Sequence, residues 1–473
     1  RGCAVAYATR HESAGQGPDA RLLFCTDGVL LREVRQDLLL RKYAAVVLDE
    51  AHERNLNTDV LLGILGGATL PLRREAAKEG SLPMLKLIIM SATLRVDDFV
   101  GNTALFPTGA PAVVKVPGRT FPVTVRHSKV TELDDYYGSA LKKVCQIHRK
   151  LPEGGILVFL TGKGEVDRMA QDLERRFGGG DDDGGRQNTY DDDAVSGADL
   201  RRAEAADAEI RDMDDDEVDG EFFRSPDGEE GDEAPPEEAG AGGAKPALVL
   251  RLYSMMSAED QARVFGDVPE GHRLIVVATN IAETSVTIPA ISYVVDTGRQ
   301  KCRNYHAQTG VASYDVMWIS RASADQRAGR AGRTGPGQCY RLYSGAVYDR
   351  KFAAFPPPEV LTRPLEDVCL AMKSMDVPDV SNFPFPTPPD KGDVRAAMRV
   401  LAALGCVDPP PEGSGGDGTI TRLGRSAASL PLGVRHAKML LVGAQAGVLD
   451  YAVAAVAVLS EQAPFLRHGG GAD

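Results

Sequence analysis

Short apolar runs alternate with helical patterns through most of the chain. The clearest runs are LKLIIMSATL, GILVFLTG, ALVLRLYS, HRLIVVATN and ISYVVDTG, and each is followed by residues that form turns or begin helices. Strands that alternate with helices in this way indicate parallel sheets. The pattern therefore predicts an α/β fold class with open parallel sheets, in which loops at the carboxyl ends of the strands build the functional site.

After Tyr343 the pattern changes. Prolines separate helical patterns in FPPPEVLTRPLEDVCLAMKSM and FPFPTPPDKGDVRAAMRVLAALG, and TITRLGRSAASLPL follows them. These segments predict a small helical or winged-helix module with a short hairpin. The apolar stretch HAKMLLVGAQAGVLDYAVAAVAVL predicts the beginning of a further helical domain.

Both ends of the sequence lack the usual boundary signals. The chain opens at Arg1 with an apolar strand pattern at Cys3–Tyr7 and no targeting signature, and the helical pattern Val448–Leu459 is followed by FLRHGGGAD. We therefore expect the sequence to be a fragment that is cut at both ends.

The composition limits the class of protein. A length of 473 residues with 43% apolar content predicts roughly two to four domains with real cores. No run of eighteen apolar residues occurs, so no membrane span is expected. The seven cysteines are scattered without a CxxC pair, which favours a reducing compartment and argues against a zinc site.

The net charge of −13 is unevenly distributed. Residues 178–244 contain 24 Asp and Glu against 5 Arg, a net −19, so the rest of the chain has 49 basic and 43 acidic residues, a net +6. The acidic segment has few large apolar side chains, which predicts disorder, and strand patterns on both sides predict that it interrupts one domain. A mildly basic folded part favours a polyanionic partner, with ordinary solvated charge as the alternative.

The stretch VVLDEAHERN places Asp49 and Glu50 at the end of an apolar run. Adjacent carboxylates repel each other unless a cation or proton shares their site, so the pair favours magnesium on a nucleotide. A solvated strand end is the alternative. A magnesium–nucleotide site also needs a phosphate-binding loop, GxxxxGK[ST], and this pattern occurs nowhere in the sequence.

The stretch QRAGRAGRTGPG contains arginines at a spacing of three, Arg327, Arg330 and Arg333. This spacing predicts guanidinium groups on one side of a helix, with Gly and Ala allowing a phosphate or another domain to approach closely. An ordinary basic helix is the alternative, although it would seldom contain so much glycine.

Taken together, these stretches resemble the motifs of the DEAH-box RNA helicases. The order and spacing agree for TDGVLLRE at 26–33, DEAH at 49–52, SAT at 91–93, FLTG at 159–162, TNIAETSVTIP at 279–289 and QRAGRAGR at 326–333. The resemblance covers nearly all of the chain outside the acidic segment. Three features are most similar to the nucleolar branch of the family, which acts on the small-subunit pre-ribosome. They are WISRASADQRAGRAGRTGPGQCYRLYSGAV, VSNFPFPTPP and the acidic insert.

The resemblance implies a domain order. Tandem RecA-like domains, the first of them incomplete, would be followed by a winged helix and the start of a helical ratchet-like domain. The expected ranges are 1–127, 128–346 with the insert 178–244, 347–428 and 429–473. The phosphate-binding loop would then precede Arg1, and an oligonucleotide-binding-fold domain would follow the chain.

The resemblance also implies ATP and Mg²⁺ as cofactors. Asp49 and Glu50 would hold hydrated Mg²⁺, and Glu50 would also polarise the attacking water. His52 and Gln326 would be partners across the cleft, and Gln326 would orient the water. These roles would make hydrolysis depend on both RecA-like domains.

The remaining nucleotide contacts implied by the resemblance lie in the second domain. Arg330 and Arg333 would act as arginine fingers, Gly329 would lie against the nucleotide, and adenine would stack on Phe265. Taken alone, a phenylalanine at this helical position is more often part of a core. Two hydroxyl residues of the first domain, Ser91 and Thr93, would relay domain closure to the RNA, although helix capping is the ordinary role of such residues.

The resemblance further implies RNA bound through its phosphates across both domains. The expected RNA contacts are Thr26, Arg54, Thr279, Asn280, Arg299, Lys301 and Arg303, and the last three lie where the family has a strand-separating β-hairpin. A solvated hairpin is the alternative for these three residues.

The implied function is an ATP-dependent RNA helicase or translocase that moves 3′ to 5′ and remodels RNA–protein complexes. Pre-ribosomal small-subunit particles and the release of small nucleolar RNA are the expected targets, and the RNA would carry a single-stranded 3′ extension. The resemblance also implies a G-patch-type activator protein as a partner. The protein is expected in the nucleus and nucleolus, without a membrane partner. The alternatives are a scaffold that binds RNA or the pre-ribosome without hydrolysis, and a spliceosomal DEAH-box helicase.

Overall fold

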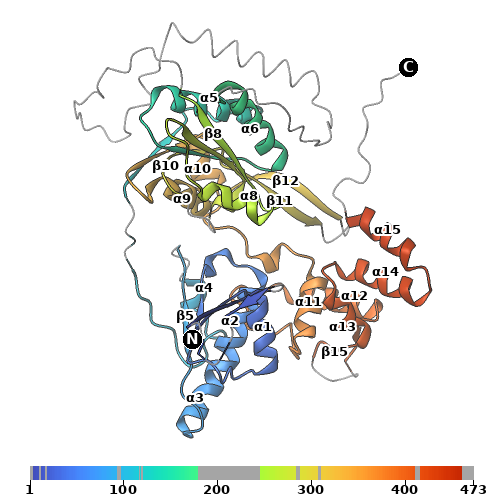
Figure 1. Ribbon diagram of the computed structural model, residues 1–473. Helices are drawn as coiled ribbons and strands as arrows, with labels where there is room; N and C mark the ends of the chain where they lie inside the picture. Colours follow the sequence, from blue (N-terminus) through green and yellow to red (C-terminus); the bar gives the residue numbers. More distant parts are fainter. Residues whose placement is uncertain are drawn as a thin grey trace, which may run out of the picture. The chain divides into compact units, whose positions relative to one another are not determined.

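The computed structural model describes residues 4–9, 12–15, 17, 19–92, 97–116, 118, 121–178, 245–283, 288–306, 311–410 and 416–460. The chain divides into two compact units (Figure 1). The first comprises Arg1–Val114, Tyr305–Ala312 and Pro357–Asp473, and the second comprises Lys115–Asn304 and Ser313–Pro356. Except for Gly178, the acidic segment 178–244 lies outside the described residues, so the expectation of disorder there stays a prediction.

The second unit is built on a six-stranded sheet with the order β6-β13-β10-β7-β9-β8. Every neighbouring pair in this sheet is parallel. The strands are β6 (Val123–His127), β7 (Gly155–Phe159), β8 (Ala247–Leu252), β9 (Arg273–Ala278), β10 (Ile291–Asp296) and β13 (Gly337–Arg341). The predicted parallel sheet is therefore confirmed.

Helices cover both faces of this sheet (Figure 1). Alternate residues of β7 show the two faces, because Ile156 and Val158 pack with α5 (Tyr136–Lys150) and α6 (Lys163–Phe177), whereas Leu157 and Phe159 belong to the opposite cluster. The opposite cluster includes residues of η4 (Arg263–Phe265), η5 (Asn280–Ala282), α9 (Arg321–Gly329) and η6 (Arg330–Gly332). All five residues of β7 are buried, as expected for a central strand.

The acidic segment connects two elements of one sheet. Helix α6 ends at Phe177, and the next described strand, β8, lies beside β9 in the same sheet as β7. Helix α8 (Ala258–Ala262) follows β8, and α10 (Gly345–Lys351) follows β13. Strands β11 (Arg299–His306) and β12 (Val311–Trp318) form a separate two-stranded sheet at the position where the family resemblance implies a hairpin.

The first unit begins with two small sheets. In one, β1 (Val5–Ala8) pairs antiparallel with β2 (Ser13–Ala14) and parallel with β3 (Leu22–Cys25). In the other, β4 (Ala45–Leu48) and β5 (Lys86–Ile89) are parallel. The helices of this part are α1 (Asp27–Gln36), α2 (Leu56–Ile64), α3 (Leu70–Lys78) and the short α4 (Asp97–Val100).

The C-terminal part of the first unit is mainly helical, as the proline-separated pattern predicts. Its elements are η7 (Glu359–Leu361), α11 (Leu365–Ser374), α12 (Lys391–Ala403), β14 (Val407–Asp408), β15 (Thr419–Ile420), α13 (Arg422–Ser429), α14 (Val434–Gln445) and α15 (Leu449–Ser460). Strands β14 and β15 pair antiparallel and form the short hairpin. No helix in the described part of the chain is long and apolar enough to cross a membrane.

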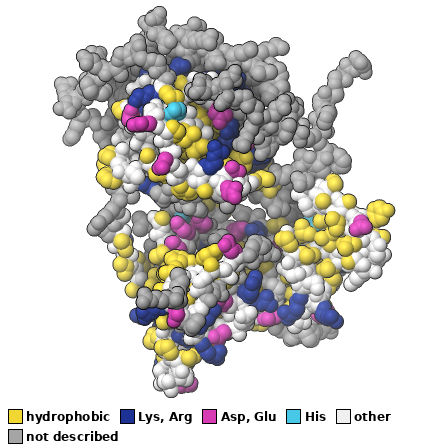
Figure 2. All heavy atoms as spheres, in the orientation of Figure 1, with side chains coloured by type: hydrophobic (Ala, Val, Ile, Leu, Met, Phe, Trp, Pro, Cys, Tyr) yellow, Lys and Arg dark blue, Asp and Glu magenta, His cyan; other side chains and the backbone are white. Residues whose placement is uncertain are grey.

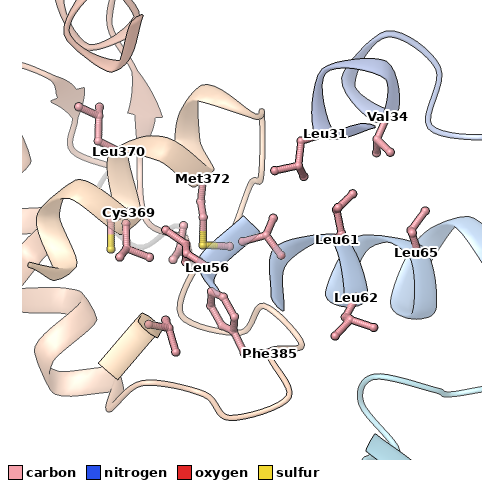
Figure 3. Packing of buried hydrophobic residues seen from close by; sticks show 14 of the residues in the cluster. Leu31, Val34, Leu56, Leu61, Leu62, Leu65, Cys369, Leu370, Met372 and Phe385 are labelled. Atoms are coloured by element: carbon pink, nitrogen blue, oxygen red, sulfur yellow. The ribbon is translucent and has the colours of Figure 1, made fainter. Parts of the chain in front are cut away.

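One hydrophobic core joins the two sequence-distant parts of the first unit (Figure 3). Leu31 of α1 and Leu61 of α2 belong to the same buried cluster as Met372 of α11 and Phe385. Leu61 and Met372 have no exposed surface, so the two parts share a fully buried hydrophobic core. The N-terminal strands and helices and the C-terminal helices therefore stabilise each other as one folded body.

Apolar side chains also remain on the surface of helices α14 and α15 (Figure 2). Tyr451 is 81% exposed, and the same helices and the turn between them carry the exposed residues Met439, Val442, Val448, Leu449, Val453, Val458 and Leu459. The residue Val456 is the buried member of α15.

Candidate functional site

The two carboxylates of the DEAH stretch lie at the carboxyl end of β4. Asp49 is exposed, and the side chain of Glu50 is 45% exposed. The Glu50 backbone N–H donates to Asp49 Oδ1 over 2.8 Å, and the Ala51 N–H donates to the carbonyl of Met90, just beyond β5, over 3.0 Å. These bonds hold the turn at the edge of the parallel pair while both carboxylates stay open to solvent.

The backbone on both sides of this turn is left-handed. Glu50 has φ 51° and Arg54 has φ 52°, and the single turn η1 (Ala51–Glu53) lies between them. A left-handed conformation costs a residue with a side chain about 1 kcal/mol, so it persists only where other contacts fix it. Asn55 then caps α2 by accepting the Thr58 N–H over 2.9 Å. The residues of the DEAH stretch are thus held in a specific bent conformation.

His52 connects this turn to the SAT stretch. Its side chain is 7% exposed, and Nδ1 lies 3.3 Å from Glu50 Oε2. The Ala92 N–H approaches the same nitrogen at 3.4 Å. Ser91 is exposed beside this contact, and Thr93 lies outside the described residues. The structure therefore brings together the two motifs for which coupling is expected.

The carboxylates of Asp49 and Glu50 fit the ligand preference of Mg²⁺. This ion takes oxygen ligands, keeps several of its waters and is commonly held by only one or two protein carboxylates together with substrate phosphates. Two exposed carboxylates at a strand end can supply such ligands. Within the described residues, no group of three or more His, Cys, Asp or Glu side chains is arranged to hold a metal.

The expectation that Arg54 contacts RNA is contradicted by its burial. Its side chain has no exposed surface, and its guanidinium donates to Asp59 over 2.8 and 3.1 Å and to Asp98 over 2.5 Å. A guanidinium that is enclosed and bonded to two carboxylates cannot reach an RNA phosphate.

The second unit carries its candidate residues at the end of α9. Ser320 begins this helix by accepting the Ser323 N–H over 3.0 Å. Gln326 is half-buried, the helix ends at Gly329, and η6 follows with Arg330, while Arg333 comes next and is half-buried. Gln326, Gly329 and Arg333 thus retain accessible surface near one helix end.

The prediction that these arginines leave their guanidinium groups open to a phosphate or another domain is wrong for Arg327. Arg327 has no exposed surface, donates to Asp296 over 2.9 Å and Glu283 over 3.1 Å, and lies over the ring of Phe159. Arg330 is 8% exposed and donates to the carbonyl oxygen of Glu283. A 3₁₀ turn follows Gly329 and also keeps positions three apart on one side, and Arg327 and Arg330 accordingly both contact Glu283.

Arg327 remains a cation in this setting. Burial alone would lower the pKa of Arg327, but the carboxylates of Asp296 and Glu283 raise its pKa above the ordinary value. Its charge is therefore paired with Asp296 and Glu283 and is not available to a ligand.

The other expected nucleotide and RNA residues lie near loop ends. Phe265 ends η4 with 52% of its surface exposed. Thr279 and Asn280 follow the carboxyl end of β9, where Thr279 is 8% exposed and Asn280 is exposed. In the first unit, Thr26 is exposed directly before α1.

The basic residues of the hairpin segment have different environments. Arg299 lies over the rings of Tyr136 (4.2 Å) and Trp318 (4.9 Å), donates to the carbonyls of Glu132 and Leu133, and burial lowers its pKa. Lys301 is exposed, with Nζ 5.5 Å from the centre of the Tyr314 ring. Arg303 belongs to β11, but its side chain lies outside the described residues.

The sequence analysis missed the acidic residues that organise these arginines. Asp296 accepts from Arg327, from the hydroxyl of Tyr343 over 2.8 Å and from the Gly298 N–H over 2.9 Å. Glu283 fixes Arg327 and Arg330. The sequence signal was an acidic residue just after an apolar strand, the same signal that identified Asp49.

Two structural features agree with a helicase fold. Two carboxylates follow strand β4 in the first unit, and the second unit has a helix end that is rich in glycine and arginine. Residues 244–335 match the family model described as "Helicase conserved C-terminal domain", and residues 434–472 match "Helicase associated domain (HA2), ratchet-like". The chain therefore has the fold class expected from its sequence, RecA-like α/β followed by ratchet-like helices.

Curated relatives match almost the whole chain. The "Probable ATP-dependent RNA helicase DHX37" of Homo sapiens is 45% identical over 96% of this chain and 42% of its own length. The "Putative ATP-dependent RNA helicase PB1A10.06c" of Schizosaccharomyces pombe is 43% identical over 96% of this chain and 36% of its own length. The chain spans about two fifths of the length of these relatives.

A solved structure agrees with these matches. The DEAH/RHA helicase HrpB of Escherichia coli is 27% identical, covers 98% of this chain and 48% of its own, and has a TM-score of 0.65. The chain belongs to the DEAH-box RNA helicase family. The resemblance found in the sequence motifs is thereby confirmed.

Proposed function

We propose that this protein is an ATP-dependent RNA helicase that uses ATP hydrolysis to move along RNA. The observation that carries the proposal is the turn after β4, where two accessible carboxylates precede a buried histidine that contacts the SAT stretch. Phosphoryl transfer to water needs a metal held by oxygen ligands, a group that orients the water and cations for the developing charge. The described residues include candidates for all three.

The residues of the first unit would act on the metal and the water. Asp49 and Glu50 would hold hydrated Mg²⁺, which neutralises phosphate charge when bound. Glu50 would also accept a proton from the attacking water, and His52 would hold Glu50 in place from 3.3 Å. Ser91 and Thr93 would transmit the state of the turn through the adjoining Ala92 contact.

The residues of the second unit would act on the nucleotide. Gln326 would orient the water, Arg330 and Arg333 would stabilise charge on the transferring phosphoryl group, and Gly329 would permit close approach. The exposed ring of Phe265 is suited to stacking on adenine. Arg330 would need to exchange its bond to the Glu283 carbonyl for a phosphate contact.

RNA would be bound mainly through its phosphates. Exposed Thr26, Asn280 and Lys301 are the best-placed candidates. Thr279 and Arg299 are more enclosed, and the side chain of Arg303 lies outside the described residues, so their contribution rests on the motif resemblance. The same resemblance supports 3′ to 5′ movement on RNA with a single-stranded 3′ extension.

The biological targets form the finer part of the proposal. Three sequence features support remodelling of small-subunit pre-ribosomal particles and release of small nucleolar RNA. They are the stretches WISRASADQRAGRAGRTGPGQCYRLYSGAV and VSNFPFPTPP and the acidic insert. This role would place the protein in the nucleus and nucleolus with a G-patch-type activator. A spliceosomal role within the same family is the competing assignment.

The test is the steady-state ATPase of the full-length native protein, with and without single-stranded RNA, beside unwinding of duplexes with a 3′ or a 5′ overhang. Glu50→Gln should lower the turnover number by about a hundredfold or more, because the proton acceptor is lost. Glu79→Gln makes the same change at an exposed helix end and should leave turnover unchanged.

Two results would refute the proposal. The first is RNA binding without hydrolysis in the wild type, which would support the scaffold alternative. The second is equal turnover in Glu50→Gln and the wild type. Preference for a 5′ overhang would reject the proposed direction while leaving hydrolysis intact.

A further inference from the structure

The C-terminal part of the first unit contacts the DEAH turn through Arg54. Besides Asp59 and Asp98, the guanidinium donates to the hydroxyl of Thr387 over 2.8 Å. Thr387 follows the FPFP stretch and lies 333 residues further along the chain. One buried side chain therefore joins the end of the DEAH turn, the helix after the SAT stretch and the C-terminal part.

A second set of bonds holds the backbone of the same turn. The Glu359 N–H donates to the carbonyl of Arg54 over 3.0 Å, and Glu359 Oε2 accepts the Leu56 N–H over 2.6 Å. The C-terminal part thus satisfies both the carbonyl of the left-handed residue and the first free N–H of α2. Without these partners the backbone polar groups would need others.

The helix after the SAT stretch is held in the same way. Asp98 of α4 accepts from Arg54, and Asn102 Nδ2 donates to the carbonyl of Phe385 over 3.2 Å. The C-terminal segment around Phe385 and Thr387 therefore contacts residues that follow the DEAH stretch and residues that follow the SAT stretch. A displacement of this segment would act on the DEAH turn and the SAT stretch together.

We infer that Arg54 is a positioning residue through which the segment Phe385–Thr387 holds Glu50 and His52 in the geometry needed for hydrolysis. Arg54 touches neither nucleotide nor RNA in this assignment. Its backbone conformation sets the end of the turn that carries His52, and its side chain makes that conformation depend on Thr387. Events that move the C-terminal part would then change the rate of hydrolysis without altering any nucleotide contact.

This inference rests on the proposed function, and its test separates the two. Thr387 is half-buried and contributes one hydroxyl, so Thr387→Val removes the bond while keeping the shape of the side chain. Thr387→Ser keeps the hydroxyl and serves as the rescue variant. Thr419→Val makes the same change on the exposed strand β15 and serves as the matched control.

The full-length native protein and these variants would be compared in steady-state ATPase, thermal unfolding and amide hydrogen exchange. Thr387→Val should lower kcat about tenfold, since small misplacement of reacting groups is costly, while KM for ATP stays within about twofold. Exchange should accelerate in residues 50–56. Thr387→Ser and Thr419→Val should both behave like the wild type.

An unchanged kcat in Thr387→Val would overturn the inference. A fall in kcat matched by an equal fall in the folded fraction would also overturn it, because it would show a purely structural role. Absence of ATPase in the wild type would instead refute the proposed function. Faster exchange in residues 50–56 of Thr387→Val, together with the lower kcat, would support the inference.

Discussion

Arg327 and Asp296 form an ion pair with no solvent-exposed surface on either side chain, with Arg327 Nη1 2.9 Å from Asp296 Oδ1. Asp296 ends the central strand β10, and Arg327 lies in the helix that carries Gln326. The pair therefore attaches the candidate catalytic helix to the sheet. A buried pair of this kind contributes little net stability by itself, but removal of one partner leaves an uncompensated charge.

Asp296→Asn should consequently destabilise the second unit by about 3 kcal/mol. The substitution keeps the shape of the side chain but removes the negative charge opposite Arg327. Arg327 then keeps its bond to the carboxylate of Glu283. Chemical denaturation monitored by circular dichroism measures the change. Glu153→Gln alters a largely exposed pair with Lys245 in the same unit and should shift the transition little. Equal stability of Asp296→Asn and the wild type would contradict this account.

Gly63→Ala should destabilise the first unit by about 2 kcal/mol. An added Cβ would lie 2.4 Å from Cε1 of Phe383, so the contact between α2 and the C-terminal part would have to open. Thermal unfolding measures the loss.

Gly28→Ala provides the matched control for Gly63→Ala. It lies in α1, where an added Cβ meets nothing within 4 Å, and it should stabilise the unit by about 0.5 kcal/mol because alanine favours helix. A Gly63→Ala protein as stable as Gly28→Ala would show that the two parts of the unit do not share the core.

Arg333→Lys should abolish most RNA-stimulated ATPase, with turnover lower by about a thousandfold, because an ammonium cannot reproduce the planar donation of a guanidinium. RNA affinity should stay within about threefold, since the charge is kept. Arg333 is a cleaner test than Arg330, whose guanidinium also donates to a backbone carbonyl. Fluorescence anisotropy with single-stranded RNA accompanies the kinetic assay.

Arg350→Lys is the control for this prediction. Arg350 is exposed on α10 and should tolerate the change without effect on turnover. Near-normal turnover in Arg333→Lys would reject the finger assignment, and a large fall in RNA affinity would indicate an RNA contact.

Protonation of His148 should destabilise the second unit in acid. Burial lowers the pKa of His148, whose Nε2 bonds the carbonyl of Lys245 over 2.8 Å. Its buried Nδ1 has no hydrogen-bond partner among the described residues. The unfolded chain, with the ordinary histidine pKa near 6.5, binds the proton more readily than the folded protein. The contribution of His148 is thus present above the unfolded pKa and lost as pH falls through it toward the folded pKa.

His148→Gln should therefore show a smaller drop in melting temperature between pH 7.5 and pH 5.5 than the wild type. Glutamine can still donate to the Lys245 carbonyl but does not titrate. His436→Gln, on α14 of the first unit, is the comparison variant. Identical pH dependence in His148→Gln and the wild type would exclude His148 as a source of acid sensitivity.

The sequence alone determined the elements and the chemistry of individual strand ends. Apolar runs predicted strands β5 and β7 to β10, and Asp49 and Glu50 could be placed after β4, because strand burial and turn preferences are local properties of the chain. The motif set also identified the family. None of these inferences required knowledge of which distant residues meet.

Only the tertiary structure decided what the arginines do. Arg54 and Arg327 were read as surface cations, but both are fully buried because carboxylates from distant positions, Asp98 and Asp296, surround them. Likewise, no periodic pattern shows that Leu61 and Met372 share a core across more than 300 residues of sequence. Periodicity reports which face of an element is buried, whereas the partner of a buried charge is fixed by contacts between segments that the sequence order does not reveal.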